Sequence, residues 1–376
     1  SFKFKGLYIF SKCFGFGFGR ASQPSAMEGS TLVNFSKILL VGEGDFTFTK
    51  AFCRHLELES IINDVQIVST SLDDREYVVK RYLDGSEEVL LDCQRSCIVQ
   101  HGVDATNLQS SFDQGAFDLI IFNFPHHPGK GKIQKNRQLL LDFFRSAEAL
   151  LPADDPLEER SRHSPLPEIR VALARGQGGT PADYPVRVWG NSWQVVEQAS
   201  QAGLVLKSVE PFNYELWQEL GYRCVGRRSQ GRGAFHAGEG ALVHAFVRAG
   251  RGAPGLHPVP RAHDLSFWYS EISHDQFLLQ QSNQDLRSVQ IPDFDEEAFL
   301  MLIHTVTQGF VQSVTLLETY ISPKLHPEKG THRVSRAYRL CYCAYSDKAL
   351  CKQEVALMQN QLREEIEEAG IGSFMP

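Results

Sequence analysis

The chain has 376 residues, of which 42% are hydrophobic, so it is long enough to bury the cores of one large and one small domain. A net charge of −7 excludes an overall positive field, and any nucleic-acid binding must therefore come from local patches. The eight cysteines form no CxxC pair and no run of eighteen apolar residues occurs, which predicts reduced intracellular thiols, no metal site and no membrane span.

The first 36 residues differ in composition from the rest of the chain. Residues 1–26 carry basic side chains and no acid, as a mitochondrial transit segment would. The alternative is that Met27 is the start, and we favour it because the glycine-rich residues 14–19 suit an amphipathic helix poorly. We expect residues 1–36 to be a disordered or non-native leader, and the protein to be cytoplasmic or nucleolar, or mitochondrial where the basic segment is a genuine transit signal.

From residue 37 to residue 248, short β-branched runs alternate with longer amphipathic runs. The predicted strands are 37–42, 65–73, 96–105, 117–125, 168–174, 204–212 and 241–247. The predicted helices are 46–56, 75–83, 133–151 and 191–203. Continuous apolar strands separated by helices are typical of a parallel sheet buried on both faces, so we predict a doubly wound, Rossmann-like α/β domain. Residues 152–167 and 226–240 interrupt it as surface loops.

A linker at 249–262 leads to a second pattern, which we assign to a small α+β domain at 263–376. Its predicted elements are a strand at 264–271, a helix at 295–308, strands at 311–321 and 335–346, and a helix at 352–370. This β-α-β-β-α order is ferredoxin-like. The fourth strand of that fold should follow Gly370, where only "IGSFMP" remains, so the sequence leaves this last strand open.

The turn after the first strand holds Gly42, Glu43, Gly44 and Asp45, at the edge where open α/β sheets bind ligands. A dinucleotide site would have the pattern G-x-G-x-x-G, but the third glycine is absent and the two carboxylates would repel a phosphate. S-adenosylmethionine has no phosphate and carries a sulfonium and an ammonium group. The acidic turn therefore favours a methyl donor.

Two further acids follow the next predicted strands. Asp73 is placed to accept hydrogen bonds from ribose hydroxyls, and Asp104 from the adenine amino group. Each acid taken alone is as well explained as a helix N-cap or a turn former. Together with the glycine turn, the set predicts a cofactor site.

The strand at 117–125 runs into Asn123, Phe124, Pro125 and His126. These residues resemble the Asn/Asp-Pro-Pro-aromatic loop by which many methyltransferases hold a planar nitrogen. The Asn123 amide would bind the base edge, and His126 would take the proton from an imide nitrogen or stack on the base. The alternative is that Pro125 only ends the strand pairing and that His126 is a solvated turn residue.

Basic side chains follow this loop and return late in the domain. They are Lys130, Lys132, Lys135 and Arg137, and then Arg223, Arg227, Arg228 and Arg232. Both groups should lie at the same rim of the sheet, where they would contact the phosphates of an RNA substrate. The alternative for either group is a solvated charged face.

These motifs together resemble the large-subunit rRNA (uridine-N-3) methyltransferase-like domain. The likeness covers residues 37–247 and is carried by "VGEGDFTF", "TSLDD", "VDATNL", "FDLIIFNFPH", "RQLLLDFFRSAEALL" and "NSWQVVEQASQAGL". It implies a class I, Rossmann-like fold that uses S-adenosylmethionine. It implies cofactor contacts at Gly42, Glu43, Gly44, Asp45, Asp73 and Asp104, and a target loop at Asn123, Pro125 and His126. The family's His-x-Gly after the proline is one residue longer here.

Residues 263–376 resemble the ferredoxin-fold anticodon-binding domain that closes phenylalanyl-tRNA synthetase chains. "RAHDLSFWY" and "VTLLETYISPKLHPEKGTHRVSRAYRLCYCAYS" carry the likeness, which implies RNA binding. From Leu256 onward, however, 10 Lys and Arg stand against 16 Asp and Glu, whereas a phosphate-binding surface should be basic. Arg333, Arg336 and Arg339 could still form a local patch, the last two on one shared face of a strand.

Two functions remain open from the sequence. The first is an RNA (uridine-N3) methyltransferase that uses S-adenosylmethionine and acts on rRNA, with tRNA as a second substrate class. The second is a non-catalytic adaptor that binds RNA or associates with a synthetase through a degenerate methyltransferase domain. The sequence does not indicate the oligomeric state.

Overall fold

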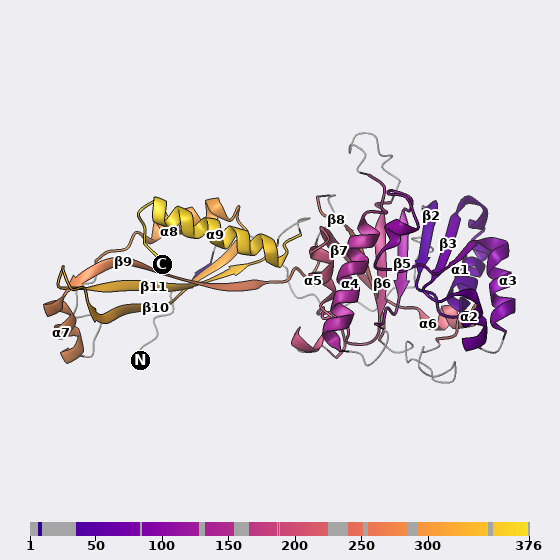
Figure 1. The fold of residues 1–376 in the computed structure, drawn as a ribbon, viewed down its shortest axis with the longest axis horizontal. Helices are drawn as coiled ribbons and strands as arrows, with labels where there is room; N and C mark the ends of the chain where they lie inside the picture. Colours follow the sequence, from indigo (N-terminus) through magenta and orange to yellow (C-terminus); the bar gives the residue numbers. More distant parts are fainter. Residues whose placement is uncertain are drawn as a thin grey trace. The chain divides into compact units, whose positions relative to one another are not determined.

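The computed structural model describes residues 7–9, 35–82, 85–127, 132–153, 165–185, 187, 189–224, 240–250, 255–283, 292–344 and 349–374. The chain divides into two compact units (Figure 1). The larger unit contains the described residues from 35 to 257, and the smaller unit contains residues 7–9 and nearly all described residues from 258 onward.

The larger unit is built on a seven-stranded sheet in the order β4-β3-β2-β5-β6-β8-β7 (Figure 1). Its strands are β2 Lys37–Val41, β3 Gln66–Ser71, β4 Ile98–His101, β5 Leu119–Asn123, β6 Glu168–Leu173, β7 Leu204–Pro211 and β8 Leu242–Arg248. All seven lie where the apolar runs predicted them, and the Rossmann-like fold is confirmed. β8 is antiparallel to both of its neighbours, a reversal that the apolar pattern alone did not indicate.

The helices of this unit include two that the sequence pattern did not predict. They are α1 Thr47–Leu58, α2 Arg75–Arg81, α3 Ser86–Ser96, α4 Ile133–Glu148, α5 Val195–Ser200 and α6 Tyr214–Glu219, with single 3-10 turns at Ile62–Asp64, Leu108–Ser110 and Trp189–Asn191. The unpredicted helices are α3 and α6. The buried apolar stripe of α3 is only Val89, Leu90 and Cys93, and α6 buries no residue fully, so neither shows a strong helical period.

Both faces of the central strands are covered. On one face, Phe52 and Leu56 of α1 join Ile121 of β5 in one apolar cluster. On the other face, the ring of Phe122, the next residue of β5, lies 4.9 Å from the ring of Phe143 of α4. Successive residues of a strand point to opposite faces, so a strand between two helical layers must be apolar at every position. This burial explains the continuous runs in the sequence.

The smaller unit is an antiparallel sheet in the order β1-β10-β11-β9. Its elements are β1 Leu7–Ile9, β9 Arg261–Ser273, α7 His274–Asn283, α8 Glu296–Val306, β10 Val311–Leu325, β11 Thr331–Tyr342 and α9 Lys352–Glu368. Helices α8 and α9 lie over one face of the sheet (Figure 1), and their Phe299 and Leu362 share a core with Phe267 and Tyr338 of the sheet. The predicted α+β, ferredoxin-like order is confirmed, with α7 as an addition.

Two short segments near the ends of the chain pair with the edges of this sheet. Ser373 makes one antiparallel bridge to Trp268 of β9, at the edge where the fourth strand of the fold would pair. On the opposite edge, β1 pairs with residues 313–315 of β10. β1 comes from the segment expected to be a leader.

The predicted arginine patch of the smaller unit was wrong. The Arg336 guanidinium lies over the rings of Tyr269 and Phe294, at 5.3 and 4.6 Å, under the helical layer. Arg339 donates two hydrogen bonds, of 2.7 and 2.8 Å, to the exposed Asp264 carboxylate. Residues three apart in a regular strand point to opposite faces, so Arg336 and Arg339 cannot share one.

Candidate functional site

The predicted cofactor and target residues meet at the carboxyl edge of the larger sheet. In the parallel pairing of β2 with β5, Val41 lies opposite Phe122, so the turn at 42–46 and the loop at 123–127 begin side by side. On the other side of β2, the Glu43 amide donates a 2.8 Å hydrogen bond to the carbonyl of Thr70 in β3. This places the ends of β2, β3 and β5 at one site, with Asp104 following the next strand, β4.

The backbone of the turn is left-handed at two positions. Gly42 has φ of 71°, and a Cβ atom there would lie 2.4 Å from Cε2 of Phe122, so only glycine fits. Phe46 has φ of 59° although it is not glycine, and its fully buried ring packs edge-on against His101 at 5.4 Å. Sequence reasoning assigned no role to Phe46. At Gly44, a Cβ would meet the Tyr82 side chain, with its hydroxyl at 3.0 Å and Cζ at 3.4 Å.

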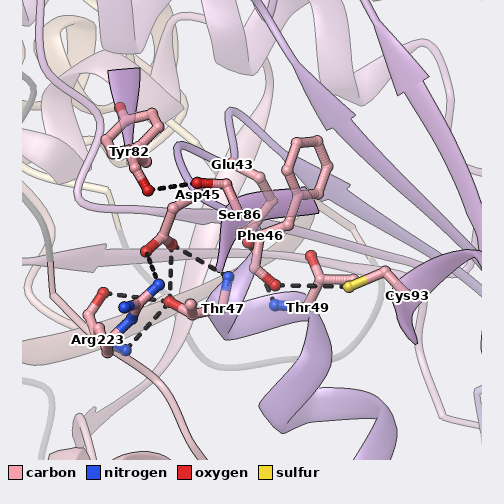
Figure 2. Close-up of polar contacts among 9 residues, drawn as sticks. All are labelled: Glu43, Asp45, Phe46, Thr47, Thr49, Tyr82, Ser86, Cys93 and Arg223. Carbon is pink, nitrogen blue, oxygen red and sulfur yellow. Dashed lines mark hydrogen bonds and ion pairs between the residues drawn. The ribbon is translucent and has the colours of Figure 1, made fainter. Parts of the chain in front are cut away.

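Glu43 points into the protein and supports the start of α1. Its Oε2 accepts a 3.2 Å hydrogen bond from the amide of Thr49, one of the helix N–H groups that lack an intrahelical partner (Figure 2). Burial raises the pKa of Glu43 to about 7, and the nearby Asp45 adds to this shift. At neutral pH this side chain is therefore only partly ionised, which weakens the expectation that it supplies a full negative charge to a ligand.

Asp45 is 4% exposed and its two carboxylate oxygens have different surroundings. Oδ1 accepts hydrogen bonds from the Thr47 amide, at 3.1 Å, and hydroxyl, at 2.7 Å. Oδ2 is buried and has no hydrogen-bond partner among the described residues; the Arg223 guanidinium is 3.6 Å from it (Figure 2). Burial raises the pKa of Asp45, and the Arg223 charge opposes that shift. Oδ2 thus has an ion pair with Arg223 but no hydrogen bond among the described residues.

The segment around Arg223 is attached to the same turn. The Arg223 amide donates a 3.1 Å hydrogen bond to the Thr47 hydroxyl, which lies 3.2 Å from the Arg223 carbonyl oxygen. Residues 176 positions apart in the chain are therefore joined at the start of α1. The sequence placed Arg223 only in a basic cluster at the rim.

Asp73 and Asp104 lie at the expected edge. Asp73 is half-buried, and its carbonyl oxygen is 3.1 Å from Nδ1 of His101. Asp104 is exposed, and its Oδ1 accepts 2.8 Å hydrogen bonds from the amide and the hydroxyl of Thr106. Asp104 therefore has the geometry of a turn former, which was the alternative prediction, and its role as a cofactor contact stays a prediction.

The target loop combines a buried amide with an exposed imidazole. Nδ2 of Asn123, at the end of β5, is buried and has no hydrogen-bond partner among the described residues. Pro125 is buried and His126 is exposed. His126 Nδ1 lies 2.8 Å from the His127 carbonyl oxygen, which can only accept, so Nδ1 carries the proton. In the neutral ring this leaves Nε2 as a proton acceptor.

The first turn of α4 holds this loop and a second one. Oδ1 of the buried Asn136 accepts a 3.0 Å hydrogen bond from the His127 amide. Arg137 donates to the carbonyl oxygens of Ser192, at 2.7 and 3.0 Å, and Gly190, at 2.9 Å. Burial lowers the pKa of Arg137. The sequence predicted a phosphate contact at Arg137, whereas the structure gives this side chain a supporting contact to the backbone.

Trp193 completes the wall beside the target loop. Its buried ring lies 6.1 Å from the His126 ring. Asn136 and Trp193 were not predicted as site residues. The only sequence signal was "NSW", which was assigned to a helix; α5 in fact begins at Val195, after Gln194 adopts φ of 55°.

The remaining predicted residues are basic. Lys132 and Lys135 are exposed in and beside the first turn of α4, at the same edge as the target loop. Lys130, Arg227, Arg228 and Arg232 lie outside the described residues. Within the described part of the chain, no three His, Cys, Asp or Glu side chains converge as metal ligands, and no helix is both long and apolar enough to cross a membrane.

Several known proteins are similar in sequence to part of this chain. Ferredoxin-fold anticodon-binding domain-containing protein 1 of Homo sapiens is 40% identical over 217 residues, which are 57% of this chain and 31% of the human protein. Its Mus musculus homologue is 39% identical over 220 residues, again 57% of this chain and 31% of the relative. The chain thus spans about a third of the length of these relatives. Heavy metal-associated isoprenylated plant protein 41 of Arabidopsis thaliana is 36% identical over 126 residues, 31% of this chain and 24% of that protein.

Solved structures of methyltransferases resemble the fold at low identity. A 30S ribosomal A1408 methyltransferase from an uncultured bacterium is 10% identical, with a TM-score of 0.33 over 57% of this chain and 87% of that one. An arsenic (III) S-adenosylmethionine methyltransferase from Chlamydomonas reinhardtii is 10% identical, with a TM-score of 0.28 over 62% of this chain and 70% of that one. Likeness at this level says nothing about activity.

A family match covers the whole candidate site. It extends over residues 39–226, which are half of the chain, and includes the glycine turn, both following acids, the target loop and Trp193. The chain belongs to the BMT5-like family, described as rRNA (uridine-N3-)-methyltransferase BTM5-like.

Proposed function

We propose that the larger unit is an S-adenosylmethionine-dependent methyltransferase that acts on N-3 of uridine in RNA, with rRNA as the favoured substrate. The observation that carries the proposal is a pair of unsatisfied buried atoms at the ends of adjacent strands: the acceptor Oδ2 of Asp45 and the donor Nδ2 of Asn123. Buried polar atoms in folded proteins nearly always have a partner, so two such atoms beyond the ends of neighbouring strands suggest ligands that supply hydrogen bonds, in addition to the Arg223 charge 3.6 Å from Oδ2.

The acidic residues at this edge fit a phosphate-free, cationic adenosyl compound. Asp45 Oδ2 would accept from the ammonium group of the cofactor, Asp73 from its ribose hydroxyls, and Asp104 from its adenine amino group. S-adenosylmethionine supplies an electrophilic methyl group on its sulfonium. Gly42 and Gly44 keep Cβ atoms away from the turn, and Glu43 holds the start of α1 in place.

The target loop fits the edge of a uracil ring. Nδ2 of Asn123 would donate to a carbonyl oxygen of the base, and this would satisfy its buried amide. Nε2 of His126 would take the N-3 proton, whose removal frees the lone pair on nitrogen. The buried Pro125 keeps the loop rigid, and Lys132 and Lys135 would bind phosphates, together with Lys130, Arg227 and Arg228 as the sequence predicts.

Calorimetry with Asp45→Asn tests the cofactor part of the proposal. The parent chain should release heat on binding S-adenosylmethionine, and the variant should bind roughly 10- to 100-fold more weakly, because a charge-assisted hydrogen bond is lost. Asp64→Asn, an exposed acid in the 3-10 turn before β3, is the matched control and should bind as the parent does. Absence of heat from the parent chain would refute the proposal.

Methyl transfer to RNA tests the catalytic part. Mass spectrometry of nucleosides from RNA treated with the parent chain and cofactor should show 3-methyluridine, and His126→Ala should reduce its rate roughly 100-fold while cofactor binding is unchanged. His127→Ala is the neighbouring control, because the backbone amide that donates to Asn136 is retained in this variant. Cofactor binding without any methylated nucleoside would reduce the proposal to a binding domain.

A second candidate function is a non-catalytic RNA-binding adaptor. One observation favours it. Glu43, Oδ1 of Asp45 and Oδ1 of Asp104 all accept hydrogen bonds that stabilise the local backbone, so these acids have a structural role that does not require a cofactor. This candidate predicts RNA crosslinking that survives His126→Ala in a chain that shows no heat with S-adenosylmethionine.

A further inference from the structure

The loop between β6 and α5 exposes aromatic side chains that the proposed reaction does not use. Tyr184 is 76% exposed and Trp189 is 41% exposed. The same loop ends at Trp193, which contacts His126 of the target loop. Single exposed apolar residues are common and need no explanation. Two solvent-exposed aromatic rings on one loop beside a candidate RNA site, however, are suited to stacking on bases.

Polar contacts hold two described parts of the loop, residues 179–183 and 189–192. Oδ2 of Asp183, a residue that is almost fully buried, accepts hydrogen bonds of 2.7 and 2.9 Å from the amides of Gly179 and Thr180. The Trp189 carbonyl accepts from the Ser192 amide and hydroxyl, at 3.2 and 3.0 Å. Arg137 also donates to the neighbouring Gly190 carbonyl. The backbone that carries Trp189 is therefore preorganised in the absence of a ligand.

Two exposed guanidinium groups accompany the rings. Arg175 donates a 2.7 Å hydrogen bond to the Tyr184 carbonyl, and its Cζ lies 5.4 Å from the centre of the Tyr184 ring. Arg187 lies over Gly176, where a Cβ atom would be 2.8 Å from its Nε. The loop's single acid, Asp183, is buried and hydrogen-bonded, so the exposed surface of the loop carries positive charge and aromatic rings together.

We propose that Tyr184 and Trp189 stack on unpaired nucleotides next to the target base, with Arg187 on the adjoining phosphate. Stacking on aromatic side chains beside cationic groups is how proteins hold single-stranded nucleic acid without reading its sequence. This loop lies beside the target loop, because the start of α4 binds both through Asn136 and Arg137 and the Trp193 ring packs near His126. Its occupant is therefore the flanking part of the same single-stranded RNA. This inference rests on the proposed function for the identity of the target base.

The test measures binding of the full chain to a fluorescent, single-stranded, uridine-rich RNA of twelve nucleotides by fluorescence anisotropy. Tyr184→Ala and Trp189→Ala should each weaken binding about 5- to 100-fold, and Trp189→Phe should retain most of the affinity. Leu58→Ala, at the far end of α1 and 73% exposed, should have no effect. The same RNA in a duplex should bind more weakly to the parent and should not distinguish the variants.

Two further arms separate stacking from charge and from damage to the fold. Arg187→Ala should reduce the slope of log affinity against log salt by about 1, whereas Arg95→Ala, on α3 with its side chain 79% exposed, should leave the slope unchanged. With an RNA whose flanking positions are abasic, Tyr184→Ala and the parent chain should bind equally. A variant that merely unfolds the loop would still differ from the parent on this RNA.

The outcomes distinguish this inference from the proposed function. Parent-like RNA binding by both aromatic variants overturns the inference even where cofactor heat and methylation persist. Absence of RNA binding by the parent chain, or a self-association that Trp189→Ala abolishes, also overturns it and assigns the surface to protein. RNA binding that depends on Tyr184 and Trp189, in a chain that releases no heat with S-adenosylmethionine, would support the inference and refute the proposed methyltransferase function.

Discussion

At the scale of single residues, the carboxylates of the first turn serve the helix as well as the proposed ligand. Oε2 of Glu43 and Oδ1 of Asp45 accept from N–H groups at the start of α1, whereas the buried Oδ2 of Asp45 has no hydrogen bond among the described residues. The sequence showed two acids and a net negative turn. It could not show which oxygen faces a ligand, because that depends on the direction of α1.

The buried Glu43 predicts a pH-dependent stability. Its pKa in the folded chain is about 7 rather than 4.5, so between these pH values the folded state retains a proton that the unfolded state releases. The free energy of unfolding should therefore fall by about 3 kcal/mol as pH rises from about 4.5 to 7, and level off above that. Urea denaturation should show this loss in the parent and in Glu59→Gln, an exposed control, but much less in Glu43→Gln. Equal slopes in all three would contradict the assignment.

Gly42 offers a second residue-level prediction with a matched control. Gly42 and Gly102 have nearly equal φ, of 71° and 72°, but a Cβ at Gly102 meets nothing within 4 Å, whereas one at Gly42 would overlap Phe122. Gly102→Ala should cost about 1 kcal/mol of left-handed strain, and Gly42→Ala about 2–4 kcal/mol. Urea denaturation measures both; equal costs would mean that the Phe122 ring moves aside freely.

At the scale of elements, the start of α4 connects the two loops that form the proposed substrate site. Asn136 holds the loop at 123–127, and Arg137 holds the backbone at 189–192. The helix itself was predicted well, since a long amphipathic run is a strong signal. The role of Arg137 was not, because its contacts are with residues more than fifty positions away.

Removing the Arg137 guanidinium should loosen the second loop without affecting the cofactor turn. Arg137→Met is expected to increase amide hydrogen exchange at residues 189–193 and to lower methyl transfer to RNA at least tenfold, with unchanged calorimetry for S-adenosylmethionine. Arg145→Met, an exposed position on the same helix, is the control. Unaltered exchange at 189–193 would show that other contacts hold the loop.

At the scale of the whole molecule, two units with separate cores share one chain. Phe52 belongs to the core of the larger unit and Phe299 to the core of the smaller one. Each core is contiguous within its own unit, so each should unfold cooperatively by itself. Among the described residues of the smaller unit, Arg336 and Arg339 lie on opposite faces of β11, so they do not form a shared phosphate-binding patch.

This separation predicts two thermal transitions that respond to different substitutions. Phe299→Ala should destabilise the smaller unit by about 3–5 kcal/mol and leave the heat of S-adenosylmethionine binding unchanged. Phe52→Ala should destabilise the larger unit by a similar amount and reduce the heat of binding. Differential scanning calorimetry measures both transitions. A single transition shifted equally by both variants would show that the units unfold as one.

The sequence by itself determined the layers of this protein. The seven strands, the long helices and the ferredoxin-like order all follow from local periodicity, because an element that is buried on one or two faces needs apolar residues at regular spacings. It also located the glycine turn and the Asn-Phe-Pro-His loop, because both stand directly after strands. Tertiary structure alone decided the antiparallel direction of β8 and the contacts of Glu43, Arg137, Arg223 and Arg336. These depend on partners distant in sequence, whose positions no local pattern records.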